Sequence, residues 1–238
     1  MSRIPRRSVT QALLAAVLTD QLTAWQQETG TEPVTVVDVG GGTGGLAAHL
    51  AGLGHHVTVI DPSPDALVSL ERRAAELGVS DLVVGRQGDA SDVVDLLGAN
   101  SVDVVICHRV LEMVDSPSDA LVAMATCLRP QGLLSLLVPG RRAAVLSHAL
   151  AGQFAAAAAA LADEHRFDPE RVARLLGQAG LEVTAQHGLG AIADMVPESA
   201  TESLAAREQL SALELQISVD PAFRALAPQL HVVARRSR

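Results

Sequence analysis

The sequence predicts an α/β fold in which a mostly parallel sheet of about seven strands is flanked by helices. Short β-branched apolar runs alternate with helix-like segments along the chain, as in a parallel sheet. Several of these runs end in glycine or aspartate, the residue types found where strands of such a sheet meet a ligand. The chain has 238 residues, of which 48% are hydrophobic and 19% charged, so it can bury a core and is not disordered.

The order of the expected elements follows from the apolar pattern. We expect strands near residues 34–39, 56–60, 82–86, 102–107 and 132–138, and two further strands at 181–188 and 231–234. We expect helices near residues 44–53, 64–77, 117–128, 168–179 and 200–215. No repeat or linker is evident, so we expect a single domain over residues 1–238, with an N-terminal helix within 1–30 and an Ala-rich cap inserted at 140–166.

A glycine-rich turn follows the first expected strand. The run from Asp38 to Gly44 has the order D-x-G-x-G-x-G, which is typical of the loop that binds S-adenosylmethionine (SAM). Glycine lets a ligand lie against bare main chain, and the helix that follows directs its first N–H groups toward that ligand. The Asp38 carboxylate can accept hydrogen bonds from the amine of the methionine part. We expect Gly40, Gly41, Gly42 and Gly44 to contact the cofactor; a tight turn without a ligand is the alternative.

A dinucleotide cofactor is a second interpretation of the same turn. Gly40, Gly42 and Gly45 also satisfy G-x-G-x-x-G, and Asp61 lies about 20 residues further on, as that fingerprint requires. Either cofactor presents ribose hydroxyls to an acid at the position of Asp61, and Pro62 directly follows it. Asp38 favours SAM, because an anion beside the loop opposes a bound pyrophosphate.

Two more segments follow strands at the expected ligand-binding edge. In the first, Asp89 can accept a hydrogen bond from an adenine amino group, with Ala90 and Ser91 beside it. A cap on the next helix, made by Asp89 or Ser91, is the alternative. The second segment leaves the fourth strand at His108, which is either a cofactor contact or an internally satisfied loop histidine; we expect the contact.

Composition limits the compartment and the class of protein. Cys107 and Cys127 lie on expected buried elements without metal-like spacing, so we predict a reduced, cytoplasmic protein that holds no metal. The arginines at positions 3, 6 and 7 before an apolar run resemble a secretory signal, but the run is short and lacks a convincing cleavage site. We expect instead an amphipathic helix that ends near Trp25. Residues 143–162 are Ala-rich and too weakly hydrophobic for a membrane span.

Taken together, these segments resemble class I SAM-dependent methyltransferases, which have a Rossmann-like fold. Within that class, the chain is most similar to the bacterial tRNA 5-carboxymethoxyuridine methyltransferase group. The class resemblance rests on residues 38–44, Asp61, residues 88–92 and the R-P-x-G sequence at 129–132, which precedes the fifth strand in the family. The group resemblance rests on residues 108–112, 133–136, 150–154, 168–169, 175–181 and 231–235.

The resemblance implies roles for individual residues. Gly41 and Gly42 would line the methionine part of SAM, Asp61 its ribose, Ala90 and Ser91 the adenine, and His108 would close the site. The chain departs from the group at Thr10, where the group has an arginine that Arg6 or Arg7 can replace. It also departs over Val138–Arg142, where aromatic residues are replaced. These changes lie on the acceptor side, so they put the identity of the substrate in doubt.

Charge tests the tRNA interpretation independently. The chain carries a net charge of −9, and six of its 18 arginines lie in the first seven and last four residues. Nucleic-acid affinity depends on basic groups that meet phosphates, so only a local patch of Arg141, Arg142 and the termini would serve. Solvated termini of an acidic protein are the alternative.

No catalytic base is evident, which suits a carboxylate acceptor that is already ionised. Arg109, Arg141 or Arg142 can orient an acidic acceptor, and a surface residue without such a role is the favoured alternative for each. We therefore expect a methyltransferase acting on a carboxylate or hydroxyl of a modified tRNA nucleoside. The alternatives are a small-molecule O- or N-methyltransferase, a non-catalytic SAM-binding protein, and an NAD-dependent reductase. The oligomeric state is not predicted.

Overall fold

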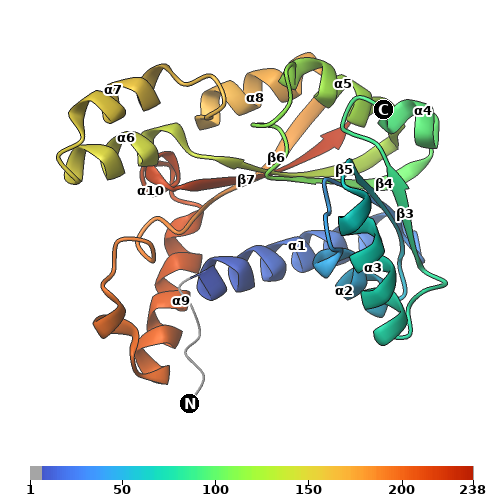
Figure 1. Ribbon diagram of the computed structural model, residues 1–238, viewed down its shortest axis with the longest axis horizontal. Helices are drawn as coiled ribbons and strands as arrows, with labels where there is room; N and C mark the ends of the chain where they lie inside the picture. Colours follow the sequence, from blue (N-terminus) through green and yellow to red (C-terminus); the bar gives the residue numbers. More distant parts are fainter. Residues whose placement is uncertain (1–6, 238) are drawn as a thin grey trace. The chain divides into compact units, whose positions relative to one another are not determined.

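The computed structural model describes residues 7–237, apart from the side chains of Arg7, Ser8 and Glu198. The candidate residues Arg3 and Arg6 and the side chain of Arg7 lie outside this description. Figure 1 shows the elements, which follow one another in this order: α1 (Arg7–Thr29), β1 (Thr35–Val39), α2 (Gly45–Gly52), β2 (His56–Asp61), α3 (Pro64–Glu76), β3 (Val83–Gln87), α4 (Val93–Leu97), β4 (Val102–His108), α5 (Pro117–Cys127), β5 (Leu128–Pro139), α6 (Arg141–Leu150), α7 (Phe154–Ala162), α8 (Pro169–Gln178), β6 (Leu181–Leu189), the 3-10 helix η1 (Glu198–Thr201), α9 (Leu204–Ser218), α10 (Pro221–Leu226) and β7 (Gln229–Arg236).

The strands form a seven-stranded sheet of order β3-β2-β1-β4-β5-β7-β6, which confirms the predicted fold class. β1 pairs in parallel with both β2 and β4, with Val37 opposite Thr58 on one side and Val105 on the other. The chain order reverses between β1 and β4, and this reversal is where open parallel sheets bind ligands, outside the carboxyl ends of the strands. The topology therefore directs attention to the residues that follow Val39 and His108.

The chain divides into two compact units, each built from separate stretches of sequence. The larger unit comprises Trp25–Leu137, Ala173–Thr184 and Val233–Arg238, and the smaller unit comprises Met1–Ala24, Val138–Val172 and Ala185–Val232. The single-domain organisation remains a prediction. So does the assignment of residues 140–166 as a cap, although helices α6 and α7 occupy that range.

The larger unit holds the β1–β4 part of the sheet. Its inner strands β1 and β4 are buried along almost their whole length, because helices cover both faces: in Figure 1, α2 and α3 lie on one side of these strands and α5 on the other. The start of α3 is fixed as expected, with the Ser63 hydroxyl accepting from Ala66 N–H at 3.3 Å and Pro64 in the first turn.

The smaller unit contains a buried carboxylate, that of Glu214 on α9. The Glu214 side chain accepts from the backbone N–H groups of Gly190 at 3.1 Å and of Ile192 and Ala193 at 2.6 Å each, and the residue is 1% exposed. A buried carboxyl group requires hydrogen-bond donors of this kind. Glu214 thus fixes the turn after β6.

The structure corrects several expected boundaries. The family-like turn at 129–132 is part of β5, which begins at Leu128: Val102 pairs with Leu128 but Val104 with Leu133, so β5 carries extra residues at a bulge where Gln131 has a φ of 66°. α1 extends to Thr29, beyond the expected end near Trp25, and α9 begins at Leu204, later than expected. The short elements α4, η1 and α10 were not predicted. Within the described residues, no helix is long and apolar enough to cross a membrane.

Candidate cofactor-binding site

The glycine turn leaves β1 in a conformation that few other residues adopt. Gly40, Gly42 and Gly44 have φ values of 70°, 56° and 70°. The Gly40 N–H donates to the Ile60 carbonyl at 2.7 Å, which ties the turn to the end of β2. Three left-handed residues within five positions explain why the sequence needs glycine there, and they leave backbone exposed where α2 begins.

The close approach of neighbouring side chains explains why positions 40 and 41 are glycine. A Cβ on Gly40 would overlap the side chain of Val110, and a Cβ on Gly41 would lie 2.5 Å from an oxygen of Asp38. The turn is therefore packed directly against the segment that follows β4 on one side and against the Asp38 carboxyl on the other. The packing of the turn therefore admits no side chain at Gly40 or Gly41.

Asp61 is held at the end of β2 by two backbone donors. Its carboxylate accepts from Gly42 N–H and from Ser63 N–H, both at 2.9 Å, and the residue is 8% exposed. The first hydrogen bond joins Asp61 to the glycine turn. The acid is thus oriented before any ligand binds.

Asp38 lies on β1, one residue before the strand ends, and is 4% exposed. Burial, and then the negative charge of Asp61, raise the pKa of the Asp38 carboxyl to about 7. A cation placed beside Asp38 would relieve both effects. This carboxyl is therefore poised to take up its charge when a positively charged group binds.

A cavity of about 420 Å³ opens at the carboxyl ends of β1 and β2. This volume is in the range of small-molecule sites. Five predicted cofactor residues line it: Gly40, Pro62, Asp89, Ala90 and Ser91. The other predicted residues, namely Asp38, Gly41, Gly42, Gly44, Asp61 and His108, are not part of this lining, so their contact with the cofactor remains a prediction. The rest of the wall consists of Val39, Ile60, Val110, Met113, Val114, Asp115, Ser116, Asp119 and Ala120.

Sequence reasoning placed the segment after β4 at the ligand-binding edge, but it did not identify residues 110–120 as a wall of the cavity. The only available signal was its position directly after β4, since nothing in its composition is unusual. The charged lining groups of the cavity are all carboxylates, those of Asp89, Asp115 and Asp119. An acidic, hydroxyl-bearing and otherwise apolar lining fits a cationic ligand and opposes a pyrophosphate.

Asp89 forms a local turn. Its carboxylate accepts from the Ser91 N–H at 2.7 Å and the Ser91 hydroxyl at 2.6 Å, and these hydrogen bonds lower the pKa of Asp89. Neither residue occupies the cap position of α4, which Asp92 takes. The alternative of a simple helix cap is therefore wrong, and Asp89 remains ionised at the cavity wall.

His108 is at the end of β4, with its Nε2 atom 2.8 Å from the Ser135 hydroxyl of β5. Burial lowers the pKa of His108 to about 4, so the ring is neutral at physiological pH. The structure thus shows the internally satisfied histidine that was the alternative interpretation, and it leaves the predicted cofactor contact open.

Comparison with known proteins resolves the choice of cofactor. The sequence profile of the family described as "Methyltransferase domain" matches residues 7–186. The chain belongs to this family. It is a SAM-dependent methyltransferase, and the dinucleotide interpretation is set aside.

Individual relatives differ in how much of the chain they match. The tRNA 5-carboxymethoxyuridine methyltransferase of Escherichia coli (strain K12) is 29% identical over 232 residues, covering 94% of this chain and 88% of the relative. A ubiquinone biosynthesis O-methyltransferase of Burkholderia pseudomallei (strain 1710b) is 31% identical over 160 residues, 65% of this chain and 67% of the relative. Among solved structures, a putative sarcosine dimethylglycine methyltransferase from Galdieria sulphuraria superposes with a TM-score of 0.64 at 14% identity, covering 94% and 85% of the two chains. The last similarity concerns the fold alone.

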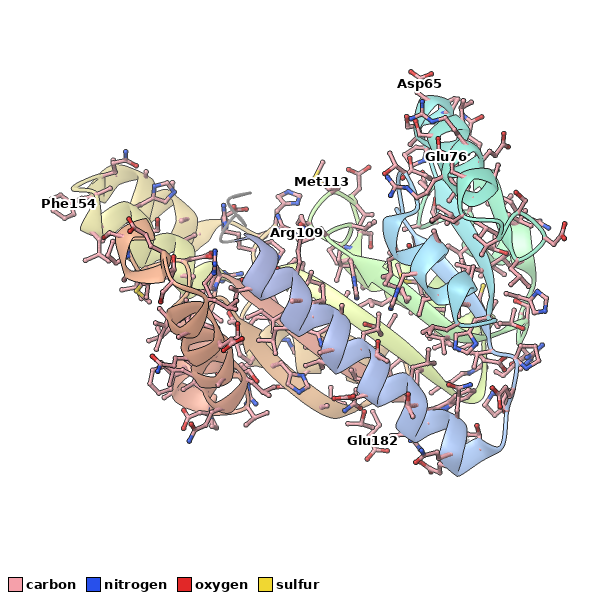
Figure 2. All side chains as sticks on the ribbon, turned by 90° about the horizontal axis from the view of Figure 1, so that it is seen from below. Asp65, Glu76, Arg109, Met113, Phe154 and Glu182 are labelled. Carbon is pink, nitrogen blue, oxygen red and sulfur yellow. The ribbon has the colours of Figure 1, made fainter. Side chains whose placement is uncertain are left out.

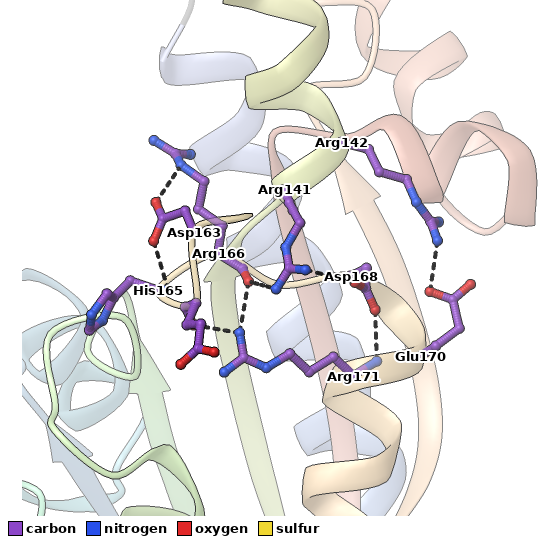
Figure 3. Close-up of polar contacts among 9 residues, drawn as sticks. Arg141, Arg142, Asp163, His165, Arg166, Asp168, Glu170 and Arg171 are labelled. Atoms are coloured by element: carbon purple, nitrogen blue, oxygen red, sulfur yellow. Dashed lines mark hydrogen bonds and ion pairs between the residues drawn. The ribbon is translucent and has the colours of Figure 1, made fainter. Parts of the chain in front are cut away.

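Two of the three arginines expected to meet an acceptor, Arg141 and Arg142, are engaged by acids of the smaller unit (Figure 3). Arg142 pairs with Glu170 at 3.0 Å, and Arg166 with Asp163 at 3.3 Å. Arg141 donates to the Arg166 carbonyl at 3.0 Å and lies 3.9 Å from Asp168.

Arg171 completes this network. It donates to the carbonyls of Glu164 and Arg166, and its guanidinium lies 4.8 Å from the ring centre of the buried Phe167. Four arginines and four acids therefore cancel formally in this cluster. It fixes the loop before α8 and presents no excess of positive charge.

Proposed function

We propose that this methyltransferase moves the methyl group of SAM to an oxygen, carboxylate or hydroxyl, of a modified nucleoside in tRNA. The observation that carries the proposal is the similarity to the E. coli tRNA 5-carboxymethoxyuridine methyltransferase, which extends over 94% of this chain. Such coverage includes the regions after β5, where methyltransferases differ most in their acceptors. A similarity confined to the cofactor loop would not include these regions.

We further propose which residues hold the cofactor. Asp38 would accept from the ammonium group, Gly41 and Gly42 would line the methionine part, and Asp61 would bind the ribose hydroxyls. Ala90 and Ser91 would frame the adenine, with Asp89 accepting from its amino group. Gly40, Gly44, Pro62 and His108 complete the proposed set. Support comes from the acidic lining of the cavity, from the raised pKa of Asp38 and from the left-handed backbone of Gly40, Gly42 and Gly44.

SAM supplies an electrophilic methyl group when bound, so the task left to the chain is to place an acceptor atom in line with it. A carboxylate acceptor is ionised at neutral pH and needs no general base. His108, with a pKa of about 4, is neutral and can accept a proton only weakly. These observations favour an acidic acceptor oxygen.

A small-molecule acceptor is the second candidate. The ion pairs of Arg141 and Arg142 favour it, because paired guanidinium groups offer less to phosphates than free ones do. The B. pseudomallei ubiquinone biosynthesis O-methyltransferase is a relative of this kind. We place either reaction in the cytoplasm, since both Cys107 and Cys127 are free and buried.

The experiment that tests the proposal is a transfer assay with methyl-labelled SAM. The purified protein is incubated separately with the tRNA, protein and metabolite fractions of a strain that lacks it. The proposal predicts label in tRNA, and nucleoside digestion should place it on an oxygen. Label confined to the metabolite fraction would establish the small-molecule alternative. Bound SAM with no label in any fraction would indicate a non-catalytic SAM-binding protein.

A further inference from the structure

The first residue after β4 has an unusual backbone. Arg109 has a φ of 64°, a region that non-glycine residues rarely occupy. Its N–H donates to the Leu137 carbonyl of β5 at 2.8 Å, so the strained residue is held to the sheet. Strain of this kind persists only where the surroundings impose it, and it often lies beside functional sites.

An ion pair closes the turn that Arg109 begins. Arg109 Nε donates to Glu112 Oε1 at 2.5 Å, and the Met113 N–H donates to the Val110 carbonyl at 2.8 Å. The Glu112 side chain is only 9% exposed, whereas that of Arg109 is 49% exposed. Figure 2 shows Arg109 and Met113 on this one turn. Because Glu112 is largely buried, removing Arg109 takes away a charged partner from a side chain that water reaches poorly.

The turn makes up one wall of the cavity. Of the residues that follow Arg109, Val110, Met113, Val114, Asp115 and Ser116 all line it. Val110 also fills the space where Gly40 lacks a side chain. The shape of the turn therefore determines both the wall itself and its fit against the glycine loop.

We propose that Arg109 and Glu112 are positioning residues for the SAM site: their ion pair holds residues 110–116 in the form that completes the cavity. Arg109 thereby shapes the cofactor site, and it does not serve to orient an acidic acceptor. This inference rests on the assignment of the cavity to SAM, and it adds two residues, Arg109 and Glu112, that are not themselves part of the cavity lining.

The test is a double-mutant cycle read out as affinity for S-adenosylhomocysteine (SAH), measured by titration calorimetry on the full chain. Arg109→Gln and Glu112→Gln should each weaken SAH binding about ten-fold, and the double variant should be no weaker than the worse single variant, because both remove one interaction. Arg109→Lys, which keeps the charge, should retain most of the affinity. The exposed pair Arg72 and Glu76 on α3, 3.9 Å apart, provides matched control variants that should bind SAH as the wild type does.

Melting temperature measured on the same variants separates positioning from stability. Lower melting temperatures with unchanged SAH affinity would overturn the proposal, as would additive losses in the double variant. If either Gln variant fails to fold, Arg109→Lys and the double variant decide the matter in the same assay. Wild-type protein that binds no SAH would instead refute the assignment of the cavity, and the positioning role with it.

Discussion

The proposed contact of Asp38 with the ammonium group of SAM, together with the raised pKa of this carboxyl, predicts that the affinity for the cofactor depends on pH. With a pKa of about 7, the carboxyl is half ionised at neutral pH, and the ammonium group of SAM or SAH favours the ionised form. Binding should therefore tighten as pH rises and Asp38 loses its proton. For a single group with this pKa, the apparent dissociation constant of SAH should be about thirty-fold larger at pH 5.5 than at pH 8.

Titration calorimetry over this pH range measures the effect directly. At pH 7, about half a proton should be released for each SAH bound, which appears as a dependence of the binding enthalpy on the ionisation enthalpy of the buffer. His108 does not interfere, because its pKa of about 4 lies below the range. Asp38→Asn should bind SAH as weakly at pH 8 as the wild type does at pH 5.5, with little change between. Asp65→Asn makes the same chemical change at an exposed residue of α3, and it should keep the wild-type dependence of SAH affinity on pH.

Two results would refute this reasoning. One is a wild-type SAH affinity that stays constant from pH 5.5 to pH 8. The other is an Asp38→Asn variant that retains both the affinity and the pH dependence of the wild type. Either would show that Asp38 does not meet the ammonium group in its ionised form.

Three further predictions concern stability. The pKa of Asp38 lies above its ordinary value of 3.8, so the folded state holds the proton more tightly than the unfolded state does. Without cofactor, the free energy of unfolding should therefore fall by up to about 4 kcal/mol as pH rises from about 4 to 7. Urea titrations of Asp38→Asn should show no such decline. Gly40→Ala should lower the melting temperature because its Cβ meets Val110, and Val110→Ala should restore part of the loss; equal melting temperatures for the single and double variants would contradict the packing argument. Glu214→Gln should reduce the free energy of unfolding by about 1–3 kcal/mol, since an amide cannot accept all three N–H groups as well as a carboxylate; an unchanged urea midpoint would argue against that role.

The fold could be predicted because its signals are local. The β-branched runs of β1 to β4 and the capping sequence at Ser63 are legible in short windows, and the structure has them within a residue or two. The start of β5 could not be predicted this way, because its sequence resembles a turn. The strand nevertheless stays paired there, through a bulge beside Val102 in which Gln131 is left-handed. Local turn chemistry and long-range pairing disagree there, and pairing prevails.

The candidate site was predictable where one residue type serves one purpose. The glycines with positive φ and the acid at the end of β2 can be recognised from the sequence alone. The wall after β4 does not, since the use of Val110 or Met113 depends on what lies across the cavity. The charge of Asp38 was likewise legible, whereas its raised pKa arises from burial and from Asp61, which only the folded chain brings near. The ion pairs of Arg141 and Arg142 also need the fold, because their partners Asp168 and Glu170 follow 27 and 28 residues later.

The central claim is that the cavity beside the glycine turn binds SAM with Asp61 as an essential contact. Equilibrium dialysis with labelled SAM, on the wild type and on Asp61→Ala, tests it most directly. The account predicts one SAM bound per wild-type chain, affinity reduced at least about ten-fold in the variant, and no competition by NAD. Unaltered SAM binding by Asp61→Ala, or displacement of SAM by NAD, would contradict it.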